Sequence, residues 1–98
     1  MKSLVCSCAV ALLALSGAAS AATAAEAAKA RIDMPHARTI ALHTYPGKIV
    51  KEELEKERGG SGLRYSFDVS GSKGTREIGV DAVTGKVLEN ADESQDND

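Results

Sequence analysis

Alternating apolar and polar residues in the middle of the chain predict an antiparallel β-hairpin. Apolar residues occupy the odd positions of residues 63–69 and polar residues the even ones, which is the period of a strand with one buried face. A turn of glycine, serine and lysine follows at residues 70–74, and residues 75–80 form a second strand with Ile78 and Val80 inward. A tight reversal at residues 81–85 precedes a short final strand over residues 86–88.

Ahead of this hairpin, apolar spacing predicts a helix over residues 34–44. Asp33 is a typical N-cap, and Pro35 falls in the first turn, where its missing N–H costs nothing. Pro46 and Gly47 end the helix. Small residues on its buried stripe favour close packing against a sheet. The stripe, spaced three and four residues apart, consists of Met34, Ala37, Ile40, Ala41 and Thr44.

The segment between these elements, residues 48–58, is ambiguous. Its glutamates, lysines and leucine favour a helix. The Pro-Gly pair before it and the glycines of residues 59–62 after it suit a short strand, in which Val50 and Leu54 would also share a face. The residues alone support helix and strand about equally.

The first 21 residues have the pattern of an export signal. Lys2 supplies the positive start, residues 4–15 are apolar, and an Ala-Ser-Ala run predicts cleavage after Ala21. A second small-residue run places an alternative cleavage site after Ala24. The apolar run is shorter than the roughly 20 residues needed to span a bilayer. We therefore expect a periplasmic or secreted protein without stable membrane insertion after cleavage.

This interpretation divides the chain into four parts. A signal peptide over residues 1–21 is followed by a flexible alanine-rich lead-in over residues 22–31, which is too short to be a stable isolated helix. The folded domain is predicted over residues 32–88. Residues 89–98 are rich in acidic residues and contain no basic one, so they are predicted to be a disordered tail.

Composition narrows the classes of function. A chain of 98 residues holds one small domain, and a net charge of −2 provides no basic face for nucleic acid. Both cysteines, Cys6 and Cys8, lie in the predicted signal peptide. The exported chain would therefore contain no thiol nucleophile, no disulfide and no cysteine metal ligand.

No residue is predicted to be catalytic, to bind a cofactor or to bind a metal. His36 and His43 lie about 10.5 Å apart along the predicted helix, too far to share one ion without distortion. The acidic tail lacks the loop and central glycine of a calcium motif, and no spacing marks a nucleophile elbow or a phosphate loop. The carboxylates of Asp68, Glu77 and Asp81 are explained by a solvated sheet face. We therefore expect no enzymatic activity.

Several motifs in order make the chain similar to the PepSY domain. The most specific are YPGK at residues 45–48 and VDAVTGKVL at residues 80–88, and the resemblance covers nearly all of residues 32–88. It implies a strand after the Pro-Gly stop. The expected fold is α+β, with one helix packed on a three-stranded antiparallel sheet in the order α-β-β-β, or on four strands if residues 86–88 join. Pro35 and His36 depart from the family pattern, and Gly79 interrupts the third strand, which indicates a bulge or a bare patch.

The resemblance also implies a function, because PepSY domains occur in the propeptides of thermolysin-type metalloproteases. We expect a non-enzymatic binding module that restrains a protease or binds another polypeptide of the cell envelope. The second hypothesis is a ligand- or ion-responsive envelope sensor or accessory protein. A charged edge strand resists uncontrolled pairing, but a partner can still add a strand to it. The predicted partner-binding edge and loop consist of Lys51, Glu52, Glu53, Lys56, Gly59, Gly60 and Gly62.

Overall fold

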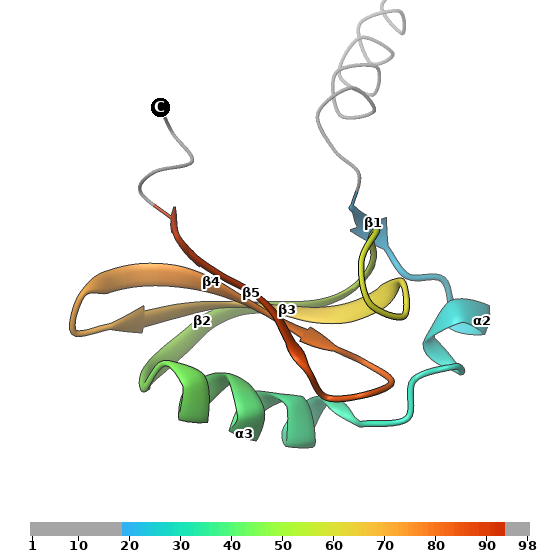
Figure 1. Cartoon of the computed structure of the whole chain (residues 1–98), viewed down its shortest axis with the longest axis horizontal. Helices are drawn as coiled ribbons and strands as arrows, with labels where there is room; N and C mark the ends of the chain where they lie inside the picture. Colours follow the sequence, from blue (N-terminus) through green and yellow to red (C-terminus); the bar gives the residue numbers. More distant parts are fainter. Residues whose placement is uncertain (1–18, 94–98) are drawn as a thin grey trace, which may run out of the picture.

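A five-stranded antiparallel sheet carries one long helix across one of its faces (Figure 1). The computed structural model describes residues 19–93. Most of the predicted signal peptide, residues 1–18, and the end of the predicted tail, residues 94–98, therefore lie outside the described residues. The strands follow one another across the sheet in chain order, and two helices separate the first two strands in sequence. The elements are β1 (Ser20–Ala21), α2 (Ala24–Ala27), α3 (Met34–Thr44), β2 (Gly47–Lys56), β3 (Leu63–Gly71), β4 (Gly74–Asp81) and β5 (Val87–Asp92).

The predicted order α-β-β-β on three or four strands is wrong, because the sheet has five strands and one of them precedes the helices. β1 shows no alternation of apolar and polar residues and coincides with a small-residue cleavage pattern, so its sequence carries no strand signal. β5 is longer than the predicted residues 86–88, because its polar residues as far as Asp92 pair with β4, and two cationic side chains bind them. Arg64 of β3 lies 3.2 Å from Glu89, and Arg76 of β4 donates to Asn90 over 2.7 Å.

Two segments flanking the predicted domain contain secondary structure. In the lead-in, Thr23 and Glu26 form a reciprocal capping box that starts α2. The N–H groups of Arg31 and Ile32 donate to the carbonyl of Ala82, which attaches this segment to the end of β4. At the other end, β5 continues beyond Leu88 to Asp92.

The prediction of the helix over residues 34–44 is confirmed. The Asp33 side chain accepts the N–H of His36 over 3.0 Å and caps the first turn. Ala37 and Ala41 are completely buried against the sheet, because their small side chains let the helix approach closely. Thr44 is exposed instead and donates its hydroxyl to the carbonyl of Ile40.

The predicted hairpin is also confirmed, and it supplies most of the core. Phe67 and Val69 of β3 and Ile78 and Val80 of β4 have no exposed surface. Tyr65 packs with them, and its hydroxyl donates to the carbonyl of Ile32 over 2.6 Å. This bond fixes the start of α3 relative to the sheet. Among residues 19–93 no helix has both the length and the apolar character needed to cross a bilayer.

Residues 47–56 form a strand, as the PepSY resemblance implies, and not a helix. Gly47 lies so close to Ser70 that a Cβ atom there would collide with the Ser70 carbonyl oxygen, so the turn after α3 requires glycine. The pairing with β3 shifts register between Ile49 and Lys51. Val50 lies at this bulge and is 57% exposed, so it does not share the buried face with Leu54.

Candidate functional site

The predicted edge strand lies at the edge of the sheet for most of its length. β1 pairs only with the end of β2, Ser20 opposite Lys56 and Ala21 opposite Glu55, and the N–H of Ala22 donates to the carbonyl of Leu54 over 3.1 Å. Within residues 19–93, no strand pairs with the outer side of residues 47–53. This leaves a row of backbone donors and acceptors facing outward.

The predicted edge residues divide between the two faces of β2. Lys51 is exposed on the face away from α3, 3.7 Å from Glu53. Glu52 points toward α3, where both of its oxygens accept hydrogen bonds from Arg38 at 2.8 and 2.7 Å. Those bonds lower the pKa of Glu52. The structure therefore does not gather these side chains into one site, and what they share is the backbone edge.

Lys56 lies beside β1, where its ammonium is 3.0 Å from Glu26 of α2. Two shallow depressions flank this end of β2, and Lys56 and Gly62 line both, so the structure brings these two predicted residues together. The larger, about 390 Å³, is lined by Ser20, Lys56, Glu57, Arg58 and Gly62. The other, about 260 Å³, is lined by Glu26, Lys29, Lys56, Ser61, Gly62, Leu63 and Val83.

The glycine loop is held in one conformation by its own hydrogen bonds. The N–H of Gly62 donates to the carbonyl of Gly59, and the N–H of Glu57 donates to the carbonyl of Gly62. Gly59, Gly60 and Gly62 have φ values of 108°, 56° and 93°, a region that side chains disfavour. A Cβ atom at Gly60 would also collide with the Asp81 carboxylate. The three predicted glycines are thus explained by the turn they make.

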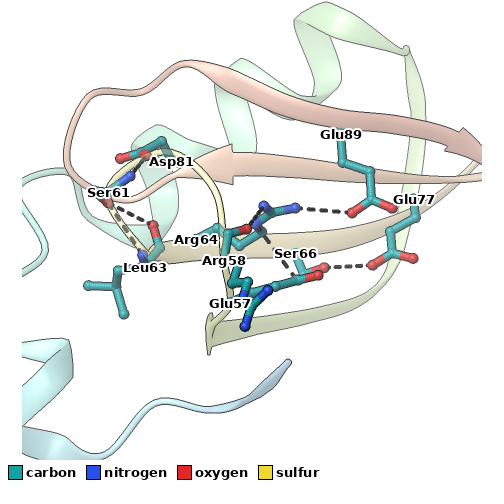
Figure 2. A network of polar contacts seen from close by, with 9 residues as sticks. All are labelled: Glu57, Arg58, Ser61, Leu63, Arg64, Ser66, Glu77, Asp81 and Glu89. Carbon is teal, nitrogen blue, oxygen red and sulfur yellow. Dashed lines mark hydrogen bonds and ion pairs between the residues drawn. The ribbon is translucent and has the colours of Figure 1, made fainter. Parts of the chain in front are cut away.

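Asp81 joins this loop to the turn between β4 and β5 (Figure 2). One carboxylate oxygen accepts the N–H of Ser61 over 2.6 Å, and the other accepts the N–H groups of Val83 and Thr84 over 2.8 and 3.0 Å. Burial favours the neutral acid, but these three donors outweigh it and lower the pKa of Asp81 to about 2.

The prediction that Asp81 lies on a solvated face is wrong, because only 1% of the residue is exposed. The sequence could have indicated that Asp81 binds backbone N–H groups, because it is the first residue of the DAVTG turn. An aspartate there typically accepts the backbone N–H groups that follow it.

Arg64 is the other buried charge, and it lies on the face of the sheet away from α3 (Figure 2). Its guanidinium is 3.2 Å from Glu89 of β5 and 3.7 Å from Glu57, and it donates to the carbonyl of Arg58 over 3.0 Å. Gly79 of β4 leaves room for it, since a Cβ atom there would lie 3.2 Å from the Arg64 side chain. The pairing of β4 with β3 is regular through Gly79, and the register shift next to it leaves the extra residue, Leu88, on β5.

Apart from Lys51 and Ser66, the other residues that line this open face are acidic. Glu55 is partly buried, and burial together with Glu53, Glu57 and Glu77 raises the pKa of Glu55 to about 7. The Ser66 hydroxyl donates to Glu77 over 3.0 Å. Within residues 19–93 no group of three or more His, Cys, Asp or Glu side chains is arranged to hold a metal ion. His36 and His43 are both exposed on α3.

A comparison with known families gives a match over most of the chain. The family model PepSY, described as the peptidase propeptide and YPEB domain, matches residues 18–90. The matched range begins before β1 and ends within β5, so it takes in every strand of the sheet at least in part. Comparisons with curated proteins and with solved structures give no match.

Proposed function

Because this chain belongs to the PepSY family, we propose that it is a non-enzymatic binding module which holds an extended segment of another polypeptide along the edge of β2. The family takes its description from peptidase propeptides, which supports a protease as the partner that is restrained. Another protein of the cell envelope is the alternative partner. The leader-like start of the sequence supports export to the periplasm or the medium.

The observation that carries this proposal is the uncovered edge of β2. In an antiparallel strand, alternate residues direct their N–H and C=O groups to the same side. The Leu54 carbonyl meets Ala22 at the outer side, whereas the Glu57 N–H meets Gly62 at the inner side. The regular pairing from Lys51 to Lys56 therefore places the backbone groups of Glu52 outward, where a partner strand can bind them.

The test uses the chain beginning at Ala22 and a purified thermolysin-type metalloprotease, with inhibition in trans as the measurement. Glu52→Pro removes the outward N–H, while Glu52→Ala removes the same side chain and keeps that N–H. Proline is tolerated at an edge position whose N–H faces solvent. Both variants lose the ion pair with Arg38. We expect Glu52→Ala to inhibit the protease as well as the unchanged chain does, and Glu52→Pro to inhibit it at least about tenfold less well than Glu52→Ala.

Charge provides a second comparison. Reversing Lys51 and Lys56 to glutamate should weaken binding, whereas Lys86→Glu, at an exposed residue in the turn before β5, should not. Absence of inhibition by the unchanged chain would contradict the protease partner. Equal inhibition by the proline and alanine variants would contradict binding at the β2 edge.

A further inference from the structure

The strand that covers the end of β2 comes from residues expected to be removed. β1 is Ser20–Ala21, and the Ala-Ser-Ala pattern predicts cleavage directly after Ala21. The alternative cleavage after Ala24 would remove the same strand. In both cases the edge of β2 differs between the precursor and the processed chain.

β1 and the residue that follows it, Ala22, together cover most of the usable edge. Beyond the bulge, the regular pairing of β2 with β3 runs from Lys51 to Lys56. In this stretch the residues whose backbone N–H and C=O groups face away from β3 are Glu52, Leu54 and Lys56. Ser20 pairs with Lys56, and Ala22 takes the Leu54 carbonyl. Among the described residues, Glu52 is the one member of this stretch whose outward backbone groups both stay open while β1 is in place.

β1 is held by little besides its backbone. Both of its residues are exposed, and neither belongs to the core or packs against it. Ser20 lines the depression of about 390 Å³ beside Lys56 and Arg58, and its small side chain leaves that depression open. A larger acidic side chain at the same position would lie next to these two cations, in a depression that Glu57 also lines, and would compete with Glu26 for Lys56.

We propose that β1 is a temporary cover of the partner-binding edge, and that removing it completes an acceptor site for an extended peptide with an acidic residue opposite Lys56. Hydrolysis of the Ala21–Ala22 peptide bond by an external leader peptidase leaves a carboxylate on Ala21 and an amine on Ala22. β1 then remains with the leader, and Ala22 becomes the N-terminal residue, no longer anchored by the pairing of Ser20 with Lys56. This inference rests on the proposed function, because it assigns the regulation and the preferred ligand of the same edge.

The test compares two chains, residues 19–98 and residues 22–98, with circular dichroism verifying that both are folded. The probe is a labelled synthetic peptide with the sequence of residues 17–24, GAASAATA, in which the serine is replaced by glutamate. Peptides with serine or lysine at that position are the matched controls. NMR titration of the Leu54 and Lys56 amides detects weak binding as well as tight binding.

We expect the chain of residues 22–98 to bind the glutamate peptide at least about tenfold more tightly than the chain of residues 19–98, and to prefer glutamate to serine and serine to lysine. In the longer chain, Ala22→Pro removes the N–H that bonds Leu54 and should increase peptide binding. Ala21→Pro removes an N–H directed away from β2 and should leave binding unchanged.

A reversible lock separates the cover from any effect of chain length. Ala21 and Glu55 are directly opposed, so cysteines at both positions can form a disulfide in the chain of residues 19–98. The oxidised protein should bind no peptide, and reduction should restore the affinity of the unlocked chain of residues 19–98. Equal binding by the oxidised and reduced forms, equal binding by the two chains, or no binding to residues 22–98 at millimolar peptide would each overturn the proposal. A chain that binds the peptide but does not inhibit the protease would refute only the protease partner.

Discussion

Replacing Asp81 with asparagine should lower stability near neutral pH and remove part of the acid sensitivity of the protein. The carboxylate accepts three backbone N–H groups from two loops and is almost completely buried. Its pKa falls from an ordinary 3.8 to about 2, which corresponds to about 2 kcal/mol of stability carried by the ionised form. That stability is fully present above pH 3.8 and is lost as the pH falls through about 2.

The assay is urea denaturation followed by circular dichroism, at several pH values from about 6 down to about 2. Asp81→Asn should reduce the free energy of unfolding by about 2 kcal/mol at the upper end, and this difference should shrink as Asp81 of the unchanged protein becomes protonated. Asp68→Asn, at a carboxylate lining the open face, is the matched control and should change little. A difference for Asp81→Asn that stays constant over the whole range would refute the reasoning.

Three further changes test other parts of the structure, each by urea denaturation. Glu55→Gln should stabilise the protein by about 1–2 kcal/mol above pH 7 and not near pH 4, because the raised pKa of Glu55 means that its ionisation costs stability as the pH rises from 4.5 through about 7; an equal effect at both pH values would contradict this. Tyr45→Phe should cost about 1–2 kcal/mol, since the Tyr45 hydroxyl accepts the Lys73 N–H over 2.9 Å and donates to the Gly74 carbonyl over 2.7 Å. An unchanged urea midpoint would show that these two hydrogen bonds contribute nothing to stability. Gly79→Ala should cost about 1–3 kcal/mol through crowding of the Arg64 side chain and of the Glu89 Cβ atom, and an Arg64→Ala background should remove the Arg64 part of that cost; an unchanged cost there would contradict crowding of Arg64.

The elements that could be predicted from the sequence are those with an unbroken period. Residues 34–44 and 63–69 repeat at the spacing of their own secondary structure, and Asp33 and Gly47 mark the ends of the helix. β2 lacks such a period for two reasons. The bulge at Val50 reverses which residues face the core. It also puts a charged residue, Glu52, on the helix side, where Arg38 pairs with it. The assignment of β2 as a strand therefore depended on family resemblance.

The candidate site was harder to predict than the fold. Arg64 and Asp81 occupy outward strand positions, so alternation assigns them to a solvated face, yet the glycine loop and β5 bury both. Partners that are distant in sequence decide their environment, and no local pattern contains that information. β1 escaped detection for another reason. Two small residues suffice to form a short edge strand, and the same residues fit a peptidase recognition pattern.

The modest core has a consequence for detecting partners. Nine apolar residues are buried in the part of the chain that the structure describes, and three of them are alanines. A domain that buries so few large side chains has a small free energy of unfolding. Any molecule that binds only the folded population raises the melting temperature in proportion to the logarithm of its concentration over its dissociation constant. The melting temperature of this domain is therefore a sensitive measure of partner binding, and fractions of an exported-protein extract can be screened for those that raise it.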